Sequence, residues 1–234
     1  MANSTSTRKF SGEKIRTLTA VGVFTALAYI CCVLFHFKAA FLSFDLKDAV
    51  MTIGAMFFGP IYGLAMSVIV STIELVTISG TGLYGYVMNI LSSVTFVCLG
   101  SFVYSRWHNM LGALLGMGLS VVAMTAVMMG ANLIITPFYM GVTVADVAAL
   151  IPTLLLPFNL TKAIFNAALV FLLYKPVSTA LKSAGFLKSE DNAVRKAYKP
   201  NPITLAVPIV IAVAAMLFFF LYLQGSVEVG SQIG

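Results

Sequence analysis

The stretch Pro157-Phe158-Asn159-Leu160-Thr161-Lys162 decides the fold class, because it places an ammonium group inside a long apolar run. From Ile151 to Tyr174, Lys162 is the one fully charged side chain. About 13 residues of helix, or about 20 Å, separate it from Lys175, so it lies deep in a bilayer core about 30 Å thick. A lysine there costs at least about 2.5 kcal/mol, so intramembrane lysines face a protein interior or a wet cavity. We therefore expect a membrane span with Lys162 at a functional site.

The composition of the 234-residue chain excludes a soluble globular domain. Hydrophobic residues make up 60% and charged residues 9%, with a mean hydropathy of +0.99. These values indicate an all-α polytopic membrane protein, because the period-2 alternation of a membrane barrel is absent. The net charge is +6, and most of the Lys and Arg residues lie in the segments next to the spans. This distribution indicates cytoplasmic segments in contact with membrane lipid and no nucleic-acid partner. Cys31, Cys32 and Cys98 form no CxxC pair, so no metal or redox cofactor is expected.

Hydropathy divides the chain into seven spans, a six-helix core and a C-terminal addition. Eleven of the fourteen Lys and Arg residues fall on one side of this threading, which predicts a cytoplasmic N-terminus and an outer C-terminus in a cell membrane. The segments are a cytoplasmic start (1–14), a six-helix membrane domain (15–181), a cytoplasmic linker (182–201) and a seventh helix with a short outer tail (202–234). Residues 38–48 are expected to fold over the outer mouth, and Asp146 is expected in an outer loop. The predicted spans are 15–37, 49–58, 61–78, 86–104, 110–135, 151–174 and 202–223.

Polar side chains on four of these spans fall at one depth in the outer half of the membrane. They are Glu74, Asn89, Asn132 and Lys162. Asn159, Lys162 and Asn166 share one helix face through their i, i+3, i+7 spacing. Aromatic residues are available above this level: Phe41, Phe44, Tyr84 and Tyr86. The pattern predicts an outward-facing pocket for a small molecule with a flat apolar part and several hydrogen-bonding groups.

Simpler interpretations of the same residues stay open. An asparagine in a span often joins two helices. Glu74 and Lys162 could neutralise one another as a buried pair, and Phe44 could anchor the chain at the interface. Gly22 and Ala26, followed by Ala28, form a face of small residues that suits either packing within the chain or docking against another membrane protein.

Four motifs together carry a resemblance to a known family. They are Phe41-Leu42-Ser43-Phe44-Asp45-Leu46-Lys47-Asp48, Phe58-Gly59-Pro60-Ile61-Tyr62-Gly63, Asn132 with Pro137-Phe138-Tyr139, and Pro157 to Lys162. With them, residues 14–181 resemble the substrate-binding S components of energy-coupling factor (ECF) transporters, most closely the riboflavin-specific type. The resemblance implies a six-helix, high-affinity vitamin binder whose site lies near the outer face under the first loop. The chain is then not an enzyme, and riboflavin is its transported ligand rather than a cofactor.

The resemblance also assigns roles to individual residues. It implies that Asn132, Asn159 and Lys162 bind riboflavin, and that Gly22 and Ala26 dock on a coupling transmembrane subunit. The loop, the outer turn and the neighbouring spans complete the expected substrate site with Leu42, Phe44, Tyr84, Asn89 and Glu74. Because the chain has no GxxxxGK[ST] loop, the energy for uptake must come from separate subunits, which the family supplies as two ATPases. Two features depart from the family: the seventh span, and Glu74.

Three other functions remain to be weighed. The chain could be an S component for another vitamin, or a self-sufficient secondary transporter in which Glu74 carries a proton or cation. An intramembrane enzyme has less support, because His36 and His108 lie near opposite faces and no paired acids or Ser/His set is found. The seventh span is expected to be peripheral and dispensable for ligand binding.

Overall fold

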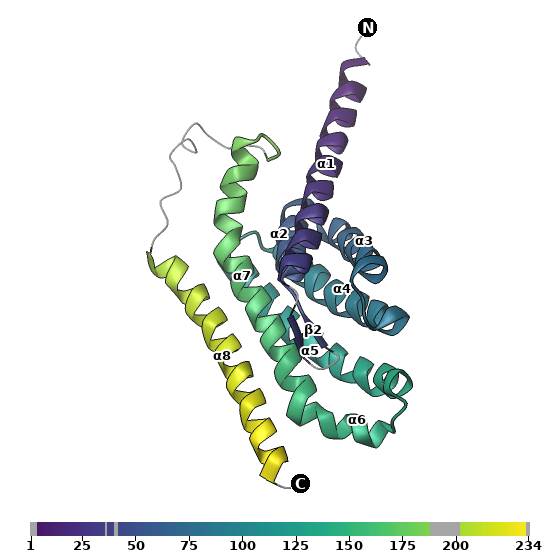
Figure 1. The fold of residues 1–234 in the computed structure, drawn as a ribbon. Helices are drawn as coiled ribbons and strands as arrows, with labels where there is room; N and C mark the ends of the chain where they lie inside the picture. Colours follow the sequence, from purple (N-terminus) through teal and green to yellow (C-terminus); the bar gives the residue numbers. More distant parts are fainter. Residues whose placement is uncertain (1–3, 36, 40–41, 188–201, 233–234) are drawn as a thin grey trace.

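A computed structural model describes residues 4–35, 37–39, 42–187 and 202–232. The fold is the helical bundle that the sequence predicted, with the addition of a small β-hairpin (Figure 1). Within the described residues, six helical segments are long and apolar enough to cross a membrane: Gly12–Leu34, Pro60–Thr77, Gly82–Arg106, Met110–Met140, Val144–Ser183 and Leu205–Tyr222. The elements in order are α1 (Ser4–Leu34), β1 (Phe37–Ala39), β2 (Leu42–Phe44), α2 (Lys47–Phe58), α3 (Pro60–Thr77), α4 (Gly82–Arg106), α5 (Met110–Met140), α6 (Val144–Leu150), the π-helical turn η1 (Ile151–Leu155), α7 (Leu156–Ser183) and α8 (Pro202–Gln232).

The second predicted span, α2, lies inside the bundle. It has 12 residues, or about 18 Å of helix, which is shorter than a hydrocarbon core of about 30 Å. Met51 and Ile53 are almost completely buried in the main hydrophobic core, together with Met66 of α3. This central helix therefore supports the residues at its N-terminal end rather than crossing the membrane alone.

Helices α4 and α5 pack closely against each other. A Cβ atom added at Gly116 would lie 2.9 Å from the carbonyl oxygen of Gly100, so the two backbones touch at this crossing. Small residues permit such close approach between membrane helices.

The predicted loop over the outer mouth folds as the antiparallel hairpin β1–β2. Phe37 pairs with Phe44 and Ala39 with Leu42. Hydropathy did not predict the strand pairing, because the paired segments are only three residues long. Leu42 and Phe44 are buried in a second hydrophobic cluster with Phe158 of α7. Phe41, an expected aromatic contact, lies outside the described residues.

Two boundaries differ from the sequence-based expectation. Asp146 is not in a loop: it stands in the first turn of α6, where Thr143 caps the helix and donates to the Asp146 carboxylate at 2.7 Å. This capping box extends the sixth span toward the N-terminus. At the C-terminus, α8 continues to Gln232 instead of ending in a short tail after residue 223. Residues 188–201, most of the expected linker, lie outside the described residues.

Candidate ligand-binding site

A cavity lies between the hairpin and helices α4, α5 and α7. The free space among its lining atoms, with the open solvent at its mouth included, is about 630 Å³. Its walls combine apolar and aromatic side chains with a few amides and one ammonium group. Six of the eight predicted substrate residues line it: Leu42, Tyr84, Asn89, Asn132, Asn159 and Lys162.

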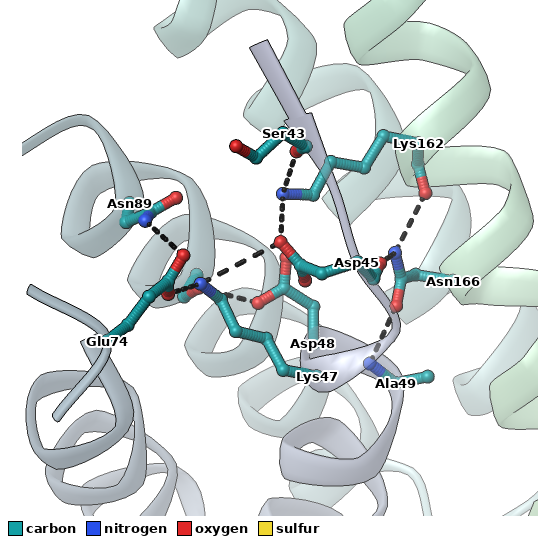
Figure 2. Close-up of polar contacts among 10 residues, drawn as sticks. Ser43, Asp45, Lys47, Asp48, Ala49, Glu74, Asn89, Lys162 and Asn166 are labelled. Carbon is teal, nitrogen blue, oxygen red and sulfur yellow. Dashed lines mark hydrogen bonds and ion pairs between the residues drawn. The ribbon is translucent and has the colours of Figure 1, made fainter. Parts of the chain in front are cut away.

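Lys162 lines this cavity, is buried, and is held by β2 and by the residue that follows it. Its Nζ lies 2.9 Å from Asp45 Oδ2 and donates to the carbonyl of Ser43 at 3.4 Å (Figure 2). The expectation that Lys162 faces the protein interior is confirmed. Its partner is Asp45 and not Glu74, so the alternative of a Glu74–Lys162 pair is wrong.

Glu74 belongs to a second ion pair behind the cavity wall. It accepts a hydrogen bond from Lys47, and Asn89 Nδ2 donates to its other oxygen at 2.9 Å (Figure 2). Lys47 Nζ also lies 3.7 Å from Asp45 Oδ2, so Asp45 stands between two lysines. Glu74 is buried and does not line the cavity, and it reaches the site only through Asn89.

Cys32 completes a group with Asp45 and Glu74 whose ligand atoms lie within 4.8 Å of one another. This spacing would suit a metal ion. The ammonium of Lys47, however, already contacts both carboxylates and occupies the position of a cation. The group is therefore an internal ion pair network.

Asn166, which shares a helix face with Lys162, ties the start of α2 to α7. Its Oδ1 accepts from the backbone N–H of Ala49 at 2.9 Å, and its Nδ2 donates to the carbonyl of Asp45 at 3.2 Å. It does not line the cavity, and both its oxygen and its nitrogen bond to the chain, so its amide serves the fold. Asp48, one residue before Ala49, accepts from Ser93 of α4 through one oxygen. The segment that follows the hairpin, residues 45–49, is thus bound to α3 through Glu74, to α4 through Ser93 and to α7 through Asn166.

The two asparagines expected to bind ligand use part of their hydrogen-bonding capacity on their own helices. Asn132 Nδ2 donates to the carbonyl of Met128 at 2.7 Å and its Oδ1 accepts from Thr136, while Asn159 Nδ2 donates to the carbonyl of Leu155 at 2.8 Å. Each amide nitrogen carries a second hydrogen that these bonds do not use. The bonds fix the rotamers of both side chains, so the amides are oriented before any ligand arrives.

The remaining predicted residues lie away from the cavity. Phe44 packs behind its wall, with its ring centroid 6.3 Å from that of Phe158. Gly22 and Ala26 are exposed on the outer side of α1, and a Cβ added at Gly22 would meet nothing within 4 Å. The interpretation that these two small residues pack within the chain is wrong. Ala28, in contrast, is fully buried.

Sequence reasoning missed Asp45 and Ser92. Asp45 lies in the quoted loop motif, where an acidic residue between two phenylalanines and a lysine was a usable signal. Ser92 lines the cavity, is 3% exposed, and its hydroxyl has no hydrogen-bond partner among the described residues. A serine in an apolar helix gives no hydropathy signal, so its position was visible only in three dimensions.

A helical membrane bundle with an oriented polar cavity under a hairpin defines a membrane-embedded binding protein for small molecules. The comparisons with known proteins agree with this class. The chain belongs to the family of ECF transporter substrate-specific components, whose family model matches residues 16–174. It is a multi-pass membrane protein of that family.

Individual relatives are distant but match over nearly their whole length. The riboflavin transporter FmnP of Bacillus subtilis (strain 168) is 24% identical, over 73% of this chain and 98% of that protein. The riboflavin transporter RibU of Staphylococcus aureus (strain TCH60) is 22% identical, over 75% of this chain and 97% of that protein. A solved S component of a bacterial ECF transporter has the same fold, with a TM-score of 0.62 at 21% identity, covering 72% of this chain and 99% of that one.

Proposed function

We propose that this chain binds riboflavin in the cavity under the hairpin and is the riboflavin-capturing subunit of an ECF-type uptake transporter. The observation that carries the proposal is the meeting of Asn132, Asn159 and Lys162 around one cavity from helices α5 and α7. The names of the two curated relatives supply the choice of vitamin.

The chemistry of the lining suits an isoalloxazine ring. Its edge alternates hydrogen-bond donors and acceptors, and an asparagine amide offers both. Lys162 has three N–H donors, of which Asp45 and Ser43 take two, so one can reach a ligand carbonyl or hydroxyl while the ion pair is kept. Tyr84, Met128 and Phe158 provide apolar surface for the flat ring.

Delivery to the cytoplasm requires partners. We expect the exposed small-residue face at Gly22 and Ala26 to dock on a coupling membrane subunit, because small residues let two helices approach closely. That subunit and two ATPases supply the energy. In this arrangement the N-terminus is cytoplasmic and the cavity opens outward.

Fluorescence titration of the purified chain with riboflavin tests the proposal. Wild-type protein should quench flavin fluorescence in a saturable way, and Lys162→Ala should weaken binding five- to more than a hundredfold, which corresponds to an unpaired buried group at about 1 to 3 kcal/mol. Lys182→Ala, at the far end of α7, is the matched control and should bind as wild type does. Absence of saturable binding, or displacement of riboflavin by an equimolar amount of another vitamin, would refute the assignment.

A further inference from the structure

The π-helical turn before α7 leaves one backbone carbonyl without its usual donor. The N–H of Leu156 bonds to the carbonyl of Ile151, a five-residue step. The next residue, Pro157, has no N–H, so the same step cannot supply a donor to the carbonyl of Pro152. Inside a bilayer an unpaired carbonyl is costly, because lipid cannot replace the missing donor.

The helix α8 supplies that donor. The hydroxyl of Tyr222 donates to the carbonyl of Pro152 at 2.9 Å. In Figure 1, α8 (yellow) runs beside α7 (green), and its C-terminal part lies near the end of α7 that meets α6. A side chain 70 positions away in the sequence thus completes the backbone hydrogen bonding of the turn.

One turn before Tyr222, α8 inserts an aromatic ring into the second hydrophobic cluster. Phe219 is 5% exposed, and its ring centroid lies 5.6 Å from that of Phe158 in an edge-to-face arrangement. Its neighbours Phe218 and Phe220 are each 54% exposed. Of three consecutive phenylalanines, only the middle one therefore packs into the bundle.

These aromatic contacts continue to the hairpin and to the cavity. Phe158 lines the cavity on one side and meets the ring of Phe44 on another, and Leu42 of the hairpin shares the same cluster. The hairpin cannot lift from α7 without separating Phe44 from Phe158. A firm position of Phe158 consequently favours the closed hairpin.

The helix α8 lies beyond the segment that the family model matches, which ends at residue 174. The solved S component is matched over 99% of its length by 72% of this chain, so its fold is complete without a large part of the present sequence. The contacts that α8 makes through Phe219 and Tyr222, which we call the brace, therefore come from a helix outside the segment that the family model matches.

We propose that α8 is a positioning element of the ligand site, in which Tyr222 and Phe219 hold the π-turn and Phe158 and so keep the hairpin closed over bound ligand. This replaces the sequence-based expectation that the seventh span is dispensable for binding. The choice of riboflavin as probe rests on the proposed function, whereas the brace itself rests on the contacts of Phe219 and Tyr222.

The test compares Phe219→Ala with Phe220→Ala in the full chain in detergent. The two variants lose the same side chain from adjacent positions, one buried and one exposed. Riboflavin release is followed by fluorescence after dilution, and backbone motion by amide hydrogen exchange. Phe219→Ala should release riboflavin about five- to tenfold faster than wild type, because side chains that hold a bound state act chiefly on the dissociation rate. Phe219→Leu should restore most of the slow release.

Hydrogen exchange separates a brace from a general loss of stability. In Phe219→Ala, exchange should rise in the hairpin and over residues 151–160, while α3 and α4 keep their protection. Tyr222→Phe removes one hydroxyl only, so it should fold normally and raise exchange in residues 151–160. Phe220→Ala should match wild type in both measurements.

Two outcomes would overturn the brace: equal release rates and hairpin exchange for Phe219→Ala and Phe220→Ala, or a rise in exchange that is uniform across all helices. If wild type failed to bind riboflavin, the proposed function would fall. The exchange comparison between the two phenylalanine variants would still decide the brace, since it needs no ligand.

Discussion

The buried carboxylate of Asp45 stabilises the segment between the hairpin and α2, because it faces the ammonium groups of Lys47 and Lys162. The substitution Asp45→Asn tests this role directly. Asp45 lies 2.9 Å from Lys162 and 3.7 Å from Lys47, and it is fully buried. The substitution keeps the shape of the side chain and removes the charge that both ammonium groups face.

The size of the effect follows from these contacts. Removing one member of a buried ion pair costs about 3 to 5 kcal/mol, because the other charge stays buried without compensation. For a chain of this length, that corresponds to a fall in the melting temperature of roughly 10 °C. Lys162 would also lose its fixed orientation, so we expect riboflavin affinity to fall about tenfold, the equivalent of about 1.4 kcal/mol.

Asp48→Asn is the matched control. Asp48 is as buried as Asp45, yet one oxygen accepts only from Ser93 and the other has no partner among the described residues. Neutralising it leaves two carboxylates, those of Asp45 and Glu74, facing two ammonium groups. We expect a change of less than about 1 kcal/mol, the net worth of one ordinary hydrogen bond. Thermal unfolding in detergent, with and without riboflavin, measures both variants. Equal losses in the two would refute the assigned roles of these carboxylates.

Three further predictions address the cavity, the second ion pair and the docking face. Ser92→Ala should weaken riboflavin binding about fivefold if the Ser92 hydroxyl bonds the ligand. Ser71 is likewise buried and without a hydrogen-bond partner among the described residues, but it lies away from the cavity, so Ser71→Ala should leave the titration unchanged. Glu74→Gln should lower the melting temperature by about as much as Asp45→Asn yet reduce riboflavin affinity less than Lys162→Ala does, and the reverse order would mean that Glu74 contacts ligand. Gly22→Leu should leave binding by the isolated chain intact and abolish uptake when the coupling subunits are present, and normal uptake by this variant would exclude docking through this face.

Local sequence patterns predicted much of the candidate site. The depth of Asn89, Asn132 and Lys162 within their spans brought them to one cavity, since a helix converts sequence position into depth at a constant rise. Depth does not determine the direction in which a side chain points around its helix axis, however. Glu74 lies at a similar depth in its span, but its side chain points toward Lys47 and does not line the cavity. The hairpin also escaped prediction, because three-residue strands carry too short a pattern to be read.

The sequence by itself determined that this is a helical membrane protein, where its six long apolar helices lie, and that Lys162 must face away from lipid. Those properties follow from the cost of placing polar groups in hydrocarbon, which each segment meets alone. Only the tertiary structure decided which carboxylate neutralises Lys162, which serine faces the cavity, and how α8 reaches Pro152. These contacts join residues as many as 117 positions apart in the sequence. They therefore depend on how the helices are arranged in space and not on the hydropathy of any single helix.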